Sequence, residues 1–238
     1  MEQLDEDRAL ARARELAEGP GPALLGIAGA PGAGKSTLAD RVVAAVPGAV
    51  LVGMDGFHLA HATLEALGRV ERKGAPDTFD AAGYVALLRR IRALGRGLDK
   101  LDHPGERELP GAATVWAPRF HREIEDAVAG AVAVTAEATL VVTEGNYLLL
   151  TEPPWDQVAG LLDECWYLDV DDDVRRTRLQ ARHERFGRTP AQARERTWGS
   201  DERNAVVVAA SRGRASAVVV SPSGLTTGRR AGRAAPLD

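Results

Sequence analysis

The most informative stretch of this 238-residue chain combines three glycines with one lysine and two hydroxyl residues. It follows the pattern Gly-x-x-x-x-Gly-Lys-Ser/Thr, in which flexible glycines let backbone N–H groups point at phosphate oxygens. Lys35 can reach the β- and γ-phosphates of a nucleoside triphosphate, and the hydroxyl of Ser36 suits Mg²⁺. We therefore predict a phosphate-binding loop. Its nine residues are Gly29, Ala30, Pro31, Gly32, Ala33, Gly34, Lys35, Ser36 and Thr37.

Two acidic residues stand at the ends of predicted strands. Asp55 follows the apolar run at 49–54, and Glu144 follows the apolar run at 139–143. Ligands of parallel sheets bind beyond the carboxyl ends of the strands, so both carboxylates should lie near the phosphate loop. Phosphoryl transfer needs an acid near Mg²⁺ and a base for the acceptor hydroxyl. We predict Asp55 as that base and as a water-mediated Mg²⁺ partner, and Glu144 as an indirect Mg²⁺ partner. The alternative is two solvated loop acids.

A highly charged helix is predicted at 171–186, and its arginines recur on one side. At about 100° per residue, Arg178, Arg182 and Arg185 fall within about 60° of one another. Such a stripe can close over a triphosphate and neutralise the charge of the transition state. We therefore predict Arg178 and Arg182 as catalytic residues together with Lys35 and Asp55. The alternative is a solvated basic face.

Four polar residues in loops form the candidate substrate site, because loops carry function more often than they carry packing. They are His58, Asp77, Arg119 and His121. Arginine and histidine beside carboxylates suit a polyhydroxylated or anionic small substrate. Each of the four taken alone also fits an ordinary surface residue.

The elements that must position these residues alternate along the chain. Apolar runs typical of buried strands alternate with helical patterns, which predicts an α/β fold with a parallel sheet. Residues 95–121 have a poor pattern and are predicted to form an irregular or short-stranded insertion that covers the site. Residues 1–220 are predicted to be one domain, and the composition of 221–238 predicts a disordered tail. The predicted strands are 24–28, 49–54, 139–145, 165–170 and 217–220, and the predicted helices are 4–17, 38–46, 61–70, 79–94, 171–186 and 190–211.

Composition excludes several classes of protein. A net charge of −4 gives no general attraction to nucleic acid or membranes. Cys165 is the single cysteine, which excludes an intramolecular disulfide and a cysteine-based metal cluster. No run approaches 18 apolar residues, and the acidic start of the chain is opposite to a basic signal peptide. We therefore expect a cytoplasmic protein with no nucleic-acid or membrane partner. The sequence is compatible with a homodimer.

Several segments together resemble the superfamily of uridine kinase, phosphoribulokinase and bacterial pantothenate kinase. The resemblance is closest to its bacterial branch labelled nucleoside/nucleotide kinase or fructose-transport kinase. It extends over about 20–220 and is carried by Gly29–Thr37, Met54–His58, Asp77–Asp80, Ala117–Arg122, Glu144–Tyr147, Arg178–His183 and Ser200–Ala205.

This resemblance implies a three-layer P-loop NTPase fold with a parallel sheet, helices on both faces and a helical lid at about 171–200. It also implies ATP with Mg²⁺ as the phosphate donor and Asp55 as the catalytic aspartate. Asp77 matches the aspartate that contacts ribose hydroxyls in uridine kinases, and the resemblance pairs His121 with their base-contacting histidine. Arg178 and Arg182 match the lid arginines. Ala75 stands where uridine kinases have a histidine, so a sugar or a vitamin-like alcohol fits as well as uridine.

The leading hypothesis is therefore an ATP-dependent kinase that transfers the γ-phosphate to a hydroxyl of a small metabolite. The acceptor would be a nucleoside, a sugar or a pantothenate-like molecule. The alternative is a P-loop NTPase that acts as a nucleotide-dependent switch or regulator. The sequence lacks the Asn-Lys-x-Asp run of GTPases and the Leu-Ser-Gly-Gly signature of transporter ATPases.

Overall fold

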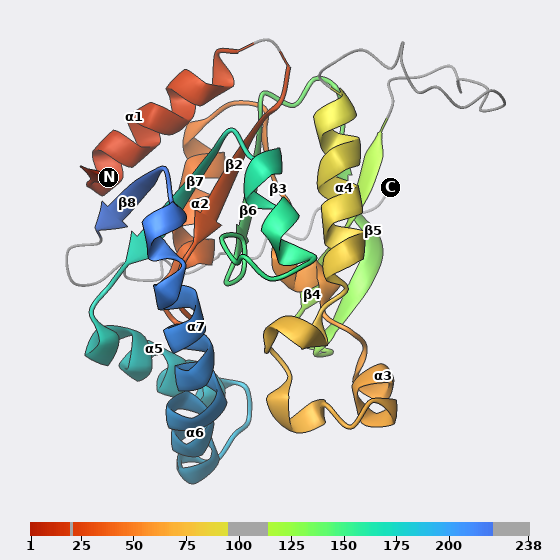
Figure 1. The fold of residues 1–238 in the computed structure, drawn as a ribbon, viewed down its shortest axis with the longest axis vertical. Helices are drawn as coiled ribbons and strands as arrows, with labels where there is room; N and C mark the ends of the chain where they lie inside the picture. The colour runs from red at the N-terminus through yellow and green to blue at the C-terminus, as the bar shows by residue number, and fades with distance from the viewer. Residues whose placement is uncertain (20, 95–113, 221–238) are drawn as a thin grey trace, which may run out of the picture.

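A parallel sheet of six strands forms the centre of the protein in the computed structural model, which describes residues 1–19, 21–94 and 114–220 (Figure 1). The order across the sheet is β1-β8-β7-β2-β6-β3, and every neighbouring pair is parallel. This confirms the predicted parallel α/β sheet. The strands are β1 (Glu2–Leu4), β2 (Ala23–Ala28), β3 (Ala49–Leu51), β6 (Leu140–Gly145), β7 (Glu164–Asp169) and β8 (Ala217–Val220).

Helices cover both faces of this sheet. Strand β2 shows how, because successive side chains of a strand point to opposite faces. Leu24 packs in one apolar core with Leu88 of α4, whereas Leu25 packs in a second core with Val42 of α2 and Ala9 of α1. The three-layer arrangement is thereby confirmed. The helices are α1 (Glu6–Ala17), α2 (Lys35–Ala45), α3 (His61–Ala66), α4 (Ala81–Leu94), α5 (Asp172–Arg185), α6 (Pro190–Arg196) and α7 (Glu202–Ala210).

A separate antiparallel hairpin pairs β4 (Val115–His121), at the end of the predicted insertion, with β5 (Asp126–Val134), which lies beyond it. The register shifts between Ala117 and Arg119, next to Pro118, which has no N–H to give to the ladder. The sequence analysis did not predict β5, because its small residues lack a strong strand pattern. Residues 95–113 of the predicted insertion and the predicted tail at 221–238 lie outside the described residues.

Several predicted elements differ from the structure in their bounds, including the first predicted helix, the strand predicted at 49–54 and the last predicted helix. Leu4 belongs to β1 and not to the first helix, which begins at Glu6. The strand predicted at 49–54 ends at Leu51, and Asp55 lies in the short 3-10 helix Met54–Phe57 that follows. The helix predicted at 190–211 is divided into α6 and α7 by the π-helical turn Thr197–Asp201.

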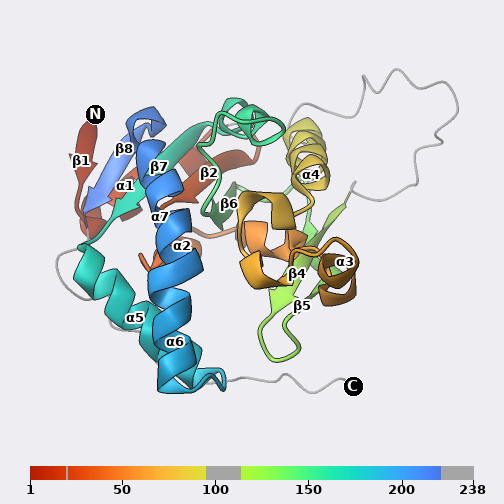
Figure 2. The same cartoon turned by 60° about the horizontal axis from the view of Figure 1, so that its bottom comes forward.

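The helices that follow the sheet strands frame the region below the sheet. Helices α5 and α6 lie on one side of this region and α3 lies on the other, with the hairpin beside α3 (Figures 1 and 2). No helix among the described residues has the length and apolar character needed to cross a membrane.

Candidate active site

The predicted phosphate loop connects β2 to α2, so its last residues form the N-terminus of a helix. Gly32 has a φ of 81° and Gly34 a φ of 101°, a conformation that glycine adopts at little cost. A Cβ on Gly32 would lie 2.5 Å from the carbonyl oxygen of Arg175 and 2.7 Å from Cγ of Leu179. Helix α5 therefore packs directly on the loop, and only a glycine leaves room for this contact.

Lys35 is buried at the first turn of α2. Its ammonium group donates to Oδ1 of Asn146 at 2.7 Å and to the carbonyl oxygen of Ala30 at 3.2 Å. Burial lowers the pKa of Lys35 to about 8, against the opposing effect of Glu144 and Asp55. The lysine thus keeps its charge at neutral pH. Asn146, which follows β6, was not among the predicted site residues.

Ser36, Glu144 and Asp55 bring a hydroxyl and two carboxylates to the same end of the sheet. The Ser36 hydroxyl donates to Oε1 of Glu144 at 3.0 Å. Burial and the charge of Asp55 raise the pKa of Glu144. Burial also acts to raise the pKa of Asp55, but the positive charges of His58, Arg122 and Lys35 outweigh it and the net shift is downward. Asp55 is therefore ionised at neutral pH, as a general base must be.

These three residues fit Mg²⁺ in chemistry, because all three offer hard oxygen ligands. No group of three or more His, Cys, Asp or Glu side chains suited to a metal occurs in the described part of the chain. Such a sparse set agrees with the usual habit of Mg²⁺, which takes one or two carboxylates and completes its shell with phosphates and water.

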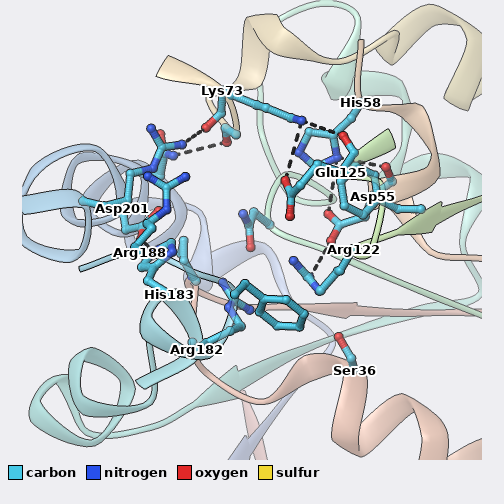
Figure 3. A pocket seen from close by; sticks show the side chains of 18 of the residues that line it. Ser36, Asp55, His58, Lys73, Arg122, Glu125, Arg182, His183, Arg188 and Asp201 are labelled. Carbon is cyan, nitrogen blue, oxygen red and sulfur yellow. Dashed lines mark hydrogen bonds and ion pairs between the residues drawn. The ribbon is translucent and has the colours of Figure 1, made fainter. Parts of the chain in front are cut away.

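Arg122 is the partner of Asp55, and the sequence analysis did not select it. It follows β4, and its Nη2 lies 3.3 Å from Oδ2 of Asp55 (Figure 3). The hairpin can approach this closely because residue 56 is glycine, where a Cβ would lie 2.7 Å from the carbonyl oxygen of Pro118. Nδ1 of His58 lies 2.9 Å from the Asp55 carbonyl oxygen and 4.0 Å from Oδ1 of its carboxylate. Burial lowers the pKa of His58, although the charge of Asp55 acts to raise it.

A cavity of about 480 Å³ joins these groups, a volume that suits a small-molecule site. Helix α5 contributes Arg182, whose guanidinium makes no hydrogen bond or ion pair to other residues in the described ranges. Burial, with repulsion from Arg122, lowers the pKa of Arg182, so a bound anion would stabilise its charge. The predicted site residues that line the cavity are Pro31, Gly32, Lys35, Ser36, Asp55, His58, Glu144 and Arg182.

Arg178 does not line this cavity but contacts the phosphate loop. Its Nη1 lies 3.3 Å from the carbonyl oxygen of Ala33, and its Nη2 is buried and has no hydrogen-bond partner among the described residues. An unpartnered buried donor beside the loop fits a phosphate oxygen. The third arginine of the predicted stripe, Arg185, is exposed and lies over the ring of Phe186 at 5.9 Å.

Three predicted substrate residues lie outside this cavity. Asp77 lines a second cavity, and its carboxylate is held 2.6 Å from Nη2 of Arg72 and 3.5 Å from Nε of Arg69. Arg119 and His121 lie on β4, from which Phe120 lines the cavity instead, followed by Arg122. Alternation along the strand gives this difference, because a shift of one residue moves a side chain to the other face.

The phosphate loop, the two carboxylates and the arginine helix above them define a P-loop nucleotide-binding protein of the kinase type. The chain belongs to the family described as AAA domain, whose model matches residues 24–207.

Similar proteins agree with this class and confirm the resemblance to uridine kinase-like proteins. A Schizosaccharomyces pombe protein named "Putative uridine kinase" is 33% identical over 220 residues, which cover 85% of this chain and 84% of that protein. An ATP-dependent kinase-like protein of Aspergillus versicolor is 36% identical over 158 residues, 64% of this chain and 84% of that protein. The crystal structure of a "putative fructose transport system kinase" from Silicibacter sp. TM1040 has a TM-score of 0.73 and 33% identity, covering 88% of this chain and 97% of that one.

Proposed function

We propose that this protein is an ATP-dependent kinase that transfers the γ-phosphate to a hydroxyl of a small metabolite. One observation carries the proposal. An ionised carboxylate, Asp55, faces the same cavity of about 480 Å³ as Lys35 and Ser36 of the phosphate loop. A base and a phosphate site in one cavity are the two halves that phosphoryl transfer to an alcohol requires.

Each side chain then has a definite task. The loop N–H groups and Lys35 bind the phosphates of ATP, and Arg182 neutralises charge on the transferred group. Ser36 and Glu144, with Asp55 through water, would hold Mg²⁺, which neutralises phosphate charge when bound. Asp55 accepts the proton of the acceptor hydroxyl. The acceptor oxygen forms a bond to the γ-phosphorus, the bond from that phosphorus to the bridging oxygen breaks, and ADP leaves.

The alternative function, a nucleotide-dependent switch, would need no second substrate. The cavity extends well beyond the phosphate loop, to Phe120 and Arg122 at the hairpin and to Lys73 near α3. This extra polar space, together with relatives that carry kinase names, favours an enzyme with an acceptor.

The test is a panel of nucleosides, sugars, pantothenate and related hydroxy acids offered with ATP and Mg²⁺. We expect at least one of them to increase ADP formation above the rate with water alone and to gain the mass of one phosphoryl group. ADP release that no acceptor accelerates, with phosphate released to water only, would support the switch instead.

A further inference from the structure

Three basic side chains gather on the side of the cavity that lies away from the phosphate loop. They are His58, Lys73 and Arg122, and we refer to them as the basic cluster. The ring of Phe120 links them: Nζ of Lys73 lies 5.6 Å, Cζ of Arg122 5.8 Å and the imidazole centroid of His58 4.9 Å from its centroid. In Figure 3, Lys73 and His58 lie above Asp55 and Arg122, whereas Ser36 lies below them.

Most hydrogen-bond donors of Lys73 and Arg122 have no partner among the residues that the structure describes. Nζ of Lys73 donates to the carbonyl oxygen of Glu125 at 2.8 Å and lies 3.7 Å from its carboxylate. Within the described part of the chain, the Arg122 guanidinium makes one hydrogen bond, a long one of 3.3 Å to Asp55. A lysine offers three donors and an arginine five, so the cluster has donors left for a ligand.

Partial burial makes these free donors significant. The side chain of Lys73 is 17% exposed and that of Arg122 is 37% exposed. A ligand that enters the cavity removes water from both groups. Each cation already faces one carboxylate, Lys73 that of Glu125 at 3.7 Å and Arg122 that of Asp55 at 3.3 Å. A neutral ligand would leave the remaining donors of both cations unpaired once water is removed, whereas an anion would accept from both.

We propose that the phosphate acceptor carries an anionic group, a carboxylate or a phosphate ester, that binds between Lys73 and Arg122. This inference rests on the proposed kinase function and names the acceptor class. Because Arg122 contacts Asp55, an anion on Arg122 brings the carbon skeleton beside that carboxylate. The reacting hydroxyl therefore lies only a few bonds from the anionic group, as in a short hydroxy acid or a sugar phosphate.

The first experiment compares acceptors that share a skeleton and differ in charge. The pairs are glycerate with glycerol and ribose 5-phosphate with ribose. We expect kcat/KM to be at least about tenfold higher for the anionic member of a pair that reacts, the effect of one charged hydrogen bond. The carboxylate and phosphate pairs distinguish the two sources of charge. Equal or better turnover of a neutral member would overturn the inference and leave the kinase function intact.

Variants of Lys73 and Arg122 test whether these two side chains cause the preference for the anionic acceptor. Lys73→Gln and Arg122→Gln should each reduce the preference for the anionic member about tenfold, mainly through KM for Lys73→Gln, while Lys73→Arg should retain most of it. Arg90→Gln is the control, because Arg90 is exposed on α4 and loses the same charge far from the cavity. A preference that all variants keep would refute the assignment of the cluster.

A binding measurement decides the inference even when no acceptor in the panel reacts. The protein is saturated with Mg²⁺ and a non-hydrolysable ATP analogue, so that the phosphate loop is filled, and sodium sulfate is titrated by calorimetry at constant ionic strength. Sulfate should bind saturably and at least about tenfold more weakly to Lys73→Gln and Arg122→Gln than to the wild type and Arg90→Gln. Absent or unchanged sulfate binding would overturn the inference. Failure of the analogue itself to bind would instead refute the proposed function.

Discussion

The packing of α5 on the phosphate loop leads to a quantitative prediction for Gly32→Ala. This substitution should lower the free energy of unfolding in two ways, and comparison with two matched glycine-to-alanine variants separates them. The first is the strain of an alanine in the left-handed conformation at φ 81°. The second is the overlap of the new Cβ with the carbonyl oxygen of Arg175, which would lie 2.5 Å away. Gly130→Ala carries the first cost alone, since Gly130 has a φ of 67° and nothing within 4 Å of an added Cβ. Gly213→Ala carries neither cost, because its Cβ meets nothing and its φ lies outside the left-handed region.

The magnitudes follow from these geometries. A left-handed alanine costs about 1–2 kcal/mol, partly offset by about 0.4–1 kcal/mol from the stiffer unfolded chain. Overlap in a packed region adds about 1–3 kcal/mol. We expect Gly213→Ala to be nearly neutral, Gly130→Ala to cost about 1 kcal/mol and Gly32→Ala about 3 kcal/mol. At about 2–4 °C per kcal/mol for a chain of this size, Gly32→Ala should lower Tm by about 6–12 °C.

Differential scanning calorimetry of the three variants measures Tm, and a titration with ATP and Mg²⁺ measures affinity. Gly32→Ala should also weaken ATP binding, because relief of the overlap moves the loop or α5. A Tm for Gly32→Ala no lower than that of Gly130→Ala would refute the reasoning that α5 rests on the loop.

Three further outcomes can be checked by steady-state kinetics with a reacting acceptor. Asp55→Asn should lower kcat by about 100- to 10,000-fold, the contribution of a general base, and near-normal turnover would remove Asp55 from that role. Arg122→Gln should raise KM for the acceptor, whereas Arg119→Gln, at an exposed position on β4 just before it, should change KM less than twofold. The reverse result would favour the sequence-based choice of Arg119. The affinity for ATP should fall as pH rises through about 8, where Lys35 loses its proton. Because its folded pKa lies below the unfolded value, the same titration should raise the stability of the free protein between about pH 8 and 10.5, and a flat profile in both measurements would contradict the burial of Lys35.

The parts of the molecule that could be predicted from the sequence are those whose contacts lie close along the chain. The phosphate loop is one, because Gly29–Thr37 carries both its turn and the start of its helix. Strand β6 is another, because its six residues are all buried and the apolar run at its start indicates a buried strand. The sequence also predicted that Asp55 and Glu144 lie at one end of the sheet, because the carboxyl ends of parallel strands meet at the same edge.

Other features depend on partners that are distant in sequence. β1 has three residues and exists as a strand because it pairs with β8, more than 200 positions later, which no local pattern indicates. Asp77 looked free to bind a substrate, but Arg69 and Arg72 hold its carboxylate. Whether Arg119 or Arg122 reaches the cavity depends on which face of the hairpin meets it. The register shift between Ala117 and Arg119 affects that face, and the sequence does not show the shift.

The segment that carries Lys73 illustrates why the acceptor side was the hardest part to predict. Its backbone is held by α6, where Arg196 donates to the carbonyl oxygens of Glu71, at 3.1 Å, and of Lys73. Asn204 of α7 donates to the carbonyl oxygen of Gly74 at 3.2 Å. The Lys73 side chain, in turn, reaches the hairpin at Glu125. Three separate parts of the chain thus fix one lysine, and each contact spans 50 residues or more. A sequence reports the charge of such a residue, but its direction is set by elements that meet only in the folded protein.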